Sequence, residues 1–218
     1  TLHLPSATSP IHYIYSYRLT DETGAVLREE WRIPHELHLP AGDTAVFTQD
    51  RWIDCPEDAP AFSAAFCDIL GQQAVAPEEA PQPGLAFSVH APALRRGERL
   101  LVTGSCEALG SWDPQRALPL TYRGQGRWSA TLPSSAIGST PTSLRYKYLL
   151  STDAGYTYLW EEGEDRWANL PDCSVYPYCY VQDSYLHLPS RPVRTAGLVA
   201  PLFSLRSDTD WGIGDFGA

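Results

Sequence analysis

Short stretches in which apolar and polar positions alternate dominate the second half of the chain. They are rich in Val, Leu, Tyr, Trp and Thr, and Gly, Pro, Asp or Ser turns separate them. Alternation with a period of two between frequent turn residues is typical of short antiparallel strands. The predicted strands start at Leu85, Arg99, Ala117, Arg127, Leu144, Thr157 and Val175. They predict an all-β fold, an immunoglobulin-like β-sandwich, over residues 84–185.

Part of this pattern occurs a second time, 131 residues earlier. Without a gap, three residues of the earlier copy align with three of the later one: Tyr15 with Tyr146, Tyr17 with Tyr148 and Glu30 with Glu161. Each copy predicts a strand, a Gly-containing turn and a second strand. The earlier copy lacks the leading strands, so residues 1–52 are expected to be the C-terminal part of a first module. The chain has no Met, even at its first position, and we expect it to be part of a longer protein.

The other segments divide the chain further. Residues 53–83 are predicted to be a linker that contains a short helix at 61–70 and ends in a stretch rich in Pro and Glu. Residues 186–197 are predicted to be a second linker. Residues 198–218 open with an apolar run followed by a Gly-rich, Asp-containing loop, which predicts the first strand of a further domain, a (β/α)8 barrel.

Composition excludes several classes of partner. With 16 basic and 26 acidic side chains the net charge is −10, which argues against nucleic acid because phosphate contacts need Lys and Arg. No apolar run approaches the roughly 20 residues of a membrane-spanning helix, so no membrane partner is expected. The five cysteines form no CxxC pair, which favours a reducing, cytoplasmic location. Because no Cys/His cluster has ligand spacing, no metal site is expected, and no cofactor is implied.

Two tryptophans stand beside polar turn residues: Trp112 in SCEALGSWDP and Trp160 in YLWEEGEDR. A Trp at a strand end can offer a flat apolar face to the C–H face of a sugar ring, while polar neighbours bind the hydroxyl groups. The alternative is ordinary core packing, the usual location of Trp. Trp128, which alternates with polar residues on a strand, is predicted to lie in the core, and Trp167 stays unassigned.

The run LVTGSCEALGSWDP, followed by YKY, LWEEGEDR and NLP, resembles the family-20 carbohydrate-binding modules, the starch-binding domains, over residues 84–185. The resemblance implies an α-glucan site made by Trp112, Lys147, Trp160, Glu161 and Asp165. The family usually has Asn where Asp165 stands, and a carboxylate accepts hydrogen bonds from sugar hydroxyls but donates none. The family's second glucan site uses two tyrosines, the first of which is replaced here by Arg96, while Tyr122 is a candidate for the other, so no second site is predicted.

The run PLFSLRSDTDWGIGDFG at 201–217 resembles the start of the family-77 4-α-glucanotransferases, the amylomaltases, which are (β/α)8 barrels. Tandem starch-binding modules before such a barrel are typical of the plant-type disproportionating enzymes. The resemblance implies a parent enzyme that transfers α-1,4-glucan segments with retention, using two carboxyl groups about 5–5.5 Å apart. No catalytic residue is assigned within this chain.

The implied partners are α-1,4-glucans: maltodextrin, starch and glycogen. Two alternatives stay open from the residues themselves. One is a non-catalytic glycan-binding or scaffold protein with immunoglobulin-like modules. The other is a purely structural module of the same shape, whose tryptophans lie in the core. Exposure of Trp112 and Trp160 separates the structural module from the binding module.

Overall fold

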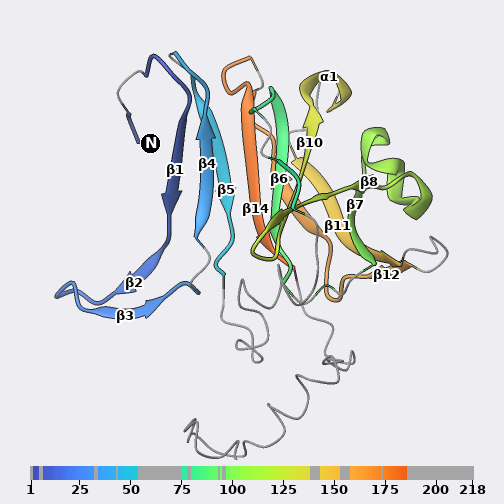
Figure 1. Cartoon of the computed structure of the whole chain (residues 1–218), viewed down its shortest axis with the longest axis horizontal. Helices are drawn as coiled ribbons and strands as arrows, with labels where there is room; N and C mark the ends of the chain where they lie inside the picture. The colour runs from blue at the N-terminus through green and yellow to red at the C-terminus, as the bar shows by residue number, and fades with distance from the viewer. Residues whose placement is uncertain are drawn as a thin grey trace, which may run out of the picture. The chain divides into compact units, whose positions relative to one another are not determined.

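The computed structural model describes residues 2–4, 7–31, 34–42, 44–53, 75–77, 80–92, 94, 97–137, 143–152, 158–172 and 174–185 (Figure 1). The predicted helix at 61–70, the linker at 186–197 and the segment 198–218 lie outside these residues. Strands predominate in the described part, and none of its helices is long and apolar enough to cross a membrane.

Two five-stranded sheets form the later part of the chain. The first contains, in order, β5 (Val46–Asp50), β14 (Tyr178–Ser184), β6 (Gly84–His90), β10 (Arg127–Pro133) and β9 (Thr121–Gly124). The second contains β12 (Tyr158–Trp160), β11 (Ser143–Thr152), β7 (Glu98–Gly104) and β8 (Leu118–Pro119), and β13 (Arg166–Asn169) also pairs with β11. Short helices η3 (Glu107–Trp112), η4 (Pro114–Arg116) and α1 (Ser134–Ile137) connect strands.

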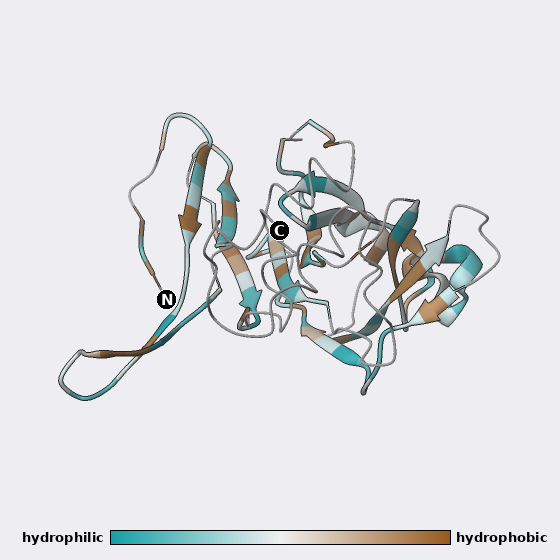
Figure 2. Ribbon diagram, turned by 60° about the horizontal axis from the view of Figure 1, so that its bottom comes forward, coloured by the Kyte–Doolittle hydropathy of each residue, from teal (hydrophilic) through white to brown (hydrophobic). Residues whose placement is uncertain are grey.

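The apolar residues of both sheets meet in one core. Phe87 of β6 packs edge-on against Tyr146 of β11, with ring centroids 5.3 Å apart. Trp128 of β10 is buried beside Tyr122, as predicted for this tryptophan. Brown apolar and teal polar segments follow one another along the strands in Figure 2, which is the pattern of sheets with one buried face. The predicted β-sandwich is therefore confirmed.

Two predicted strands differ from the structure. The run from Ala117 does not form one strand, because β8 pairs with β7 in one sheet and β9 pairs with β10 in the other. Between them the Leu120 amide donates to the Leu100 carbonyl at 2.9 Å. The strand predicted from Val175 starts only at Tyr178, after a turn in which the Asp172 carbonyl accepts from two amides. Strand β13 was not predicted.

The earlier part of the chain forms smaller sheets. β1 (Ile11–Tyr15) pairs with β4 (His35–Leu39), and β2 (Arg18–Thr20) pairs with β3 (Val26–Glu29) as the predicted hairpin. β5 pairs in parallel with β14, and in Figure 1 it lies at the edge of that sheet. The sequence boundary at residue 52 therefore does not separate two sheets, because a strand of the earlier copy extends a sheet of the later one.

The predicted repeat is visible in the hydrogen bonds. In each copy two tyrosine hydroxyls, two residues apart in sequence, donate to one aspartate. The two groups are Tyr15 and Tyr17 with Asp50, at 2.7 Å each, and Tyr146 and Tyr148 with Asp183, at 2.6 and 2.9 Å. Desolvation by burial, together with the neighbouring carboxylate, raises the pKa of all four hydroxyls. The two copies thus share this pattern of hydrogen bonds, although the segment that is one strand, β11, in the later copy is divided into β1 and β2 in the earlier one.

Candidate functional site

One face of β11 points away from the core and carries predicted site residues. Lys147 pairs with Thr103 of β7, and Leu149 pairs with Trp160 of β12. Directly opposed residues of antiparallel strands share a face, as do residues two apart on one strand. Lys147, Thr103 and Trp160 therefore share the face opposite to that of Tyr146. On this face Thr103 is fully buried, Lys147 is partly buried and Trp160 is exposed.

Trp160 stands at the end of β12 and is 38% exposed. After it, residues 161–165 leave the strand and return as β13, so both flanks of this loop pair with β11. The Glu161 amide donates to the Tyr148 carbonyl at 2.9 Å and fixes the start of the loop. Trp167 of β13 pairs with Arg145 and is also exposed on the outer face. The Trp160 side chain can therefore offer ring surface to a ligand.

Trp112 ends η3 and is half-buried. Its φ is +69°, and those of Gly110 and Ser111 are +79° and +49°. Non-glycine residues enter this left-handed region at a cost of about 1–2 kcal/mol, and such strain concentrates at functional sites. The Thr103 hydroxyl donates to the Leu109 carbonyl at 2.8 Å and ties this loop to β7. Trp112 therefore occupies a defined loop beside the strand that neighbours Lys147.

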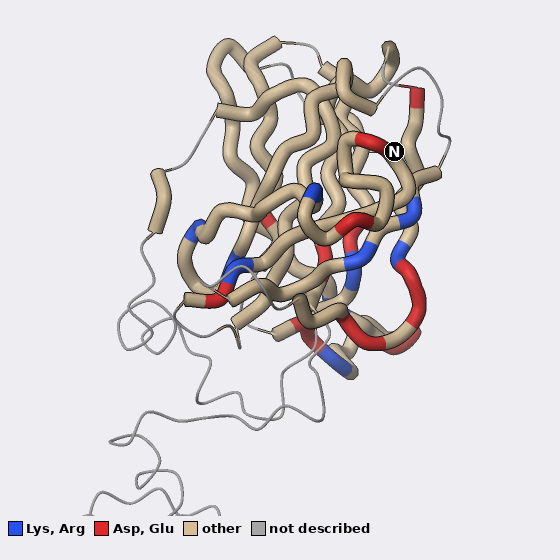
Figure 3. The backbone as a smooth tube through the Cα atoms, turned by 90° about the vertical axis from the view of Figure 1, so that its right-hand side faces the viewer, with Lys and Arg blue, Asp and Glu red and all other residues tan. Residues whose placement is uncertain are grey.

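A cluster of charges lies beside the Trp160 loop. The Lys147 ammonium donates to the Gly163 carbonyl at 2.6 Å and lies 3.9 Å from the Asp165 carboxylate. Arg145 donates to the other oxygen of Asp165 at 2.5 Å. Figure 3 shows basic and acidic segments next to one another in the lower half of the view. The structure thus brings Lys147 and Asp165 together, and adds Arg145, which the sequence analysis missed although it stands two residues before Lys147.

Glu161 does not face solvent, and its predicted role as a sugar contact requires correction. Its side chain is 1% exposed, and its two oxygens accept from Nε and Nη2 of Arg166 at 2.9 and 2.6 Å. Nη1 of Arg166 also lies 3.1 Å from Asp183. Although desolvation lowers the pKa of Arg166, its bonds to Glu161 and the charge of Asp183 raise it overall. Glu161 instead anchors the loop that carries Trp160.

The family's second glucan site was not predicted for this chain, and the structure gives it no support at Tyr122. Tyr122 is buried, and its hydroxyl accepts a hydrogen bond from the Gly126 amide at 3.1 Å, so its ring is part of the core. Arg96 lies outside the described residues. No metal site was expected from the sequence, but the structure brings together three side chains that could hold a metal ion: His12, Glu36 and His38.

Comparisons with known proteins test the two family resemblances, to the starch-binding domains and to the 4-α-glucanotransferases. Residues 84–177 match the family model described as a starch binding domain, which confirms the resemblance of this stretch. The curated protein "4-alpha-glucanotransferase DPE2" of Oryza sativa subsp. japonica is 32% identical over 217 residues. That match covers 93% of this chain, and the chain spans 22% of the relative's length.

Solved structures are also similar to parts of the chain. Hormoconis resinae glucoamylase is 24% identical, with 57% of this chain and 20% of that chain covered, at a TM-score of 0.41. The family 20 carbohydrate-binding module of a maltotetraose-forming amylase from Pseudomonas saccharophila is 18% identical, with 46% and 98% covered, at a TM-score of 0.35. Both TM-scores are below 0.5, so the assignment of a β-sandwich rests on the strand pairing described above and not on these structures.

Proposed function

We propose that the chain binds α-glucans such as starch, glycogen and maltodextrin, as part of a longer 4-α-glucanotransferase. The observation that supports this most directly is the starch-binding match over residues 84–177, within which the exposed Trp160 lies next to Lys147 and Asp165. In the purely structural alternative Trp112 and Trp160 would both lie in the core, whereas Trp160 is 38% exposed.

The proposed binding uses stacking and hydrogen bonds. Trp160 stacks on the C–H face of a glucose unit, and Trp112 on the η3 loop contacts a second unit. Lys147 and Arg145 donate to hydroxyl groups, and Asp165 accepts from them. Each aromatic contact contributes about 0.5–1.5 kcal/mol, by analogy with aromatic pairs. Two contacts and a few hydrogen bonds give a total of about −4 to −8 kcal/mol, which corresponds to millimolar to micromolar Kd.

We propose that binding is confined to the later copy. In the earlier copy Ser16 stands at the position of Lys147, and Glu29 at that of Trp160, so the cation and the ring are both replaced at the aligned positions. Trp31, two residues further on, could supply a ring, but it lies against His90, with ring centroids 5.2 Å apart. Residues 1–52 then serve as the partial first module, and its β5 extends the sheet of the module at 84–185. Linked modules of this kind hold an attached catalytic domain close to a polymer by raising its effective concentration.

The proposed parent enzyme transfers α-1,4-glucan segments with retention. Its support is the 32% identity to the rice enzyme and the resemblance of residues 201–217 to the start of a barrel. In such chemistry one carboxylate forms a covalent glycosyl intermediate, and a sugar hydroxyl then takes the place of water. The proposed cytoplasmic location of this enzyme is supported by the odd number of cysteines and the lack of a CxxC pair in the sequence.

Titration of intrinsic Trp fluorescence with maltoheptaose or β-cyclodextrin tests the binding proposal. The chain is expected to show saturable quenching, and Trp112→Ala and Trp160→Ala are each expected to weaken binding about tenfold. The double variant should lose the response entirely. Trp52→Ala, in the earlier copy, is the matched control and should keep the affinity.

Circular dichroism establishes that each variant is folded. A folded chain without any response, or a double variant that binds as tightly as the unchanged chain, would overturn the proposal. Loss of binding in Trp52→Ala alone would show instead that the earlier copy provides the site.

A further inference from the structure

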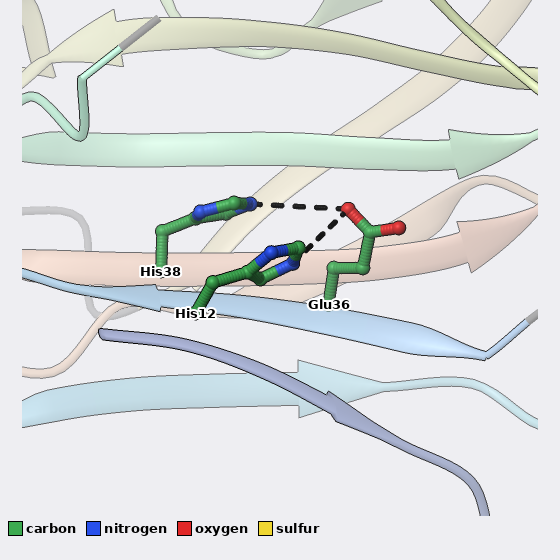
Figure 4. A group of neighbouring side chains, drawn as sticks. All are labelled: His12, Glu36 and His38. Carbon is green, nitrogen blue, oxygen red and sulfur yellow. Dashed lines mark ion pairs between the residues drawn. The ribbon is translucent and has the colours of Figure 1, made fainter. Parts of the chain in front are cut away.

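Two histidines and a glutamate meet on one face of the β1–β4 pair. His12 of β1 and His38 of β4 are direct cross-strand partners, and their rings stack with centroids 4.0 Å apart. Glu36 stands two residues before His38 and therefore shares its face. Figure 4 shows both imidazoles directed toward the Glu36 carboxylate. The three side chains come from two adjacent strands, so the backbone pairing defines their spacing.

The distances among these groups are close to those of a metal site. Nε2 of His12 lies 3.5 Å from Oε2 of Glu36, and Nε2 of His38 lies 3.8 Å from the same oxygen. One ligand atom from each residue lies within 4.8 Å of the others. Donors at about 2.0–2.2 Å from a tetrahedral Zn²⁺ are about 3.3 Å apart. Binding therefore requires side-chain rotations in which the two stacked imidazoles turn their Nε2 atoms toward one point.

The glutamate is oriented by groups outside the cluster. Its Oε1 lies 2.6 Å from Nη1 of Arg127 on β10, which leaves Oε2 for the histidines. The backbone amide of Glu36 donates to Oε1 of Gln182 on β14 at 3.1 Å, which fixes the main chain of β4 at this residue. Such outer partners hold a metal-binding carboxylate in position.

We propose that His12, Glu36 and His38 bind one Zn²⁺ ion, with water in the remaining position. Two imidazoles and one carboxylate suit a borderline ion such as Zn²⁺, whereas Mg²⁺ and Ca²⁺ prefer all-oxygen sites. The side chains are about one third exposed, so the ion has access from solvent. The ion joins β1 to β4 and, through Glu36 and Arg127, to β10. This site is separate from the proposed glucan site and does not depend on it.

Metal-ligand spacings within one segment of the sequence do not reveal this cluster, because its residues come from two strands. His12 and Glu36 are 24 residues apart, and only the antiparallel register places them together. The sequence HELHL contains one local indication of the cluster: Glu36 and His38 are two residues apart and so share one face of a strand.

Isothermal titration calorimetry of Zn²⁺ binding to the 218-residue chain tests the proposal. The thiols are first blocked with iodoacetamide, because the five cysteines can themselves bind zinc. We expect one Zn²⁺ per chain, and His12→Gln and His38→Gln should each weaken binding at least tenfold. The exposed His3 lies outside the cluster, so His3→Gln is the matched control and should bind normally.

Replacement of Zn²⁺ by Co²⁺ gives a second, spectroscopic readout. The intense visible absorption of four-coordinate Co²⁺ is expected with the unchanged chain and with His3→Gln, and not with His12→Gln. Binding of less than one equivalent, or equal binding by His12→Gln and the unchanged chain, would overturn the proposal. Circular dichroism of the variants confirms that lost binding does not reflect unfolding.

Discussion

Glu161 and Arg166 form a buried ion pair in which both carboxylate oxygens accept hydrogen bonds from one guanidinium group. The earlier copy repeats this relationship 131 residues upstream, where Glu30 and His35 lie 2.9 Å apart and are also buried. A glutamate with a cationic or polar partner five residues later is therefore part of the local structure of both copies. This relationship explains why Glu161 belongs to the framework and not to the ligand surface.

Glu161→Gln is expected to destabilise the chain by about 3 kcal/mol, because removal of one partner from a buried ion pair leaves the other uncompensated. The effect should fall at the lower end of the usual range, since Arg166 keeps its contact with Asp183 at 3.1 Å. Chemical denaturation monitored by circular dichroism measures the loss. Glu162→Gln, on the exposed side of the same loop, should leave the free energy of unfolding nearly unchanged. The folded Glu161→Gln chain is expected to bind glucan with an affinity within threefold of that of the unchanged chain. A tenfold loss of affinity in a fully folded variant would show that Glu161 contacts the sugar.

Gly110→Ala is expected to weaken glucan binding by displacing the Trp112 loop. At Gly110 φ is +79°, and an added Cβ would stand 2.7 Å from the Arg116 carbonyl oxygen, which belongs to the backbone. Gly24 has a similar φ of +85° with nothing within 4 Å, so Gly24→Ala introduces only the conformational strain of about 1 kcal/mol. Fluorescence titration with maltoheptaose should show reduced affinity for Gly110→Ala and unchanged affinity for Gly24→Ala. Equal affinities would mean that the loop conformation is irrelevant to binding.

His90 is expected to make the chain sensitive to acid. Burial, together with the charge of Arg127, lowers its pKa to about 3, and among the described residues its Nε2 atom has no hydrogen-bond partner. Below pH 6.5 the unfolded chain takes up a proton that the folded chain refuses, so stability falls as pH falls. Between pH 7 and pH 5 this group alone removes about 2 kcal/mol of unfolding free energy.

The measurement compares urea unfolding of the chain and of His90→Phe at both pH values. The variant lacks the titrating ring nitrogen, so its stability should fall by about 2 kcal/mol less over this interval than that of the unchanged chain. Parallel pH dependences for the two proteins would show that His90 accepts its proton in the folded state.

Local pattern was sufficient for most of the strands. The strands predicted from Leu85, Arg99, Arg127 and Leu144 begin within one residue of β6, β7, β10 and β11. Alternation of apolar residues depends only on which face of a strand is buried, and this is visible in a single segment. The run from Ala117 shows the limit of such a pattern. Its alternation continues across the change of sheet because both sheets bury their apolar residues in one core.

For the candidate site, residue types and motif order were sufficient to single out Trp160, Lys147 and Asp165, which the structure places on or beside one exposed face. They were not sufficient for Glu161, because its burial depends on Arg166 and on Asp183 from another strand.

The amino-acid sequence by itself determined the strand pattern, the buried Trp128, the internal repeat and the starch-binding motif, since each is recorded in neighbouring residues or in a fixed offset. Only the tertiary structure decided which sheet each strand joins, that β5 extends the sheet of the later copy, and that His12 lies opposite His38. The physical reason is that hydrogen bonds between strands are made by backbone groups common to all residues. Their register is selected by the packing of the whole fold.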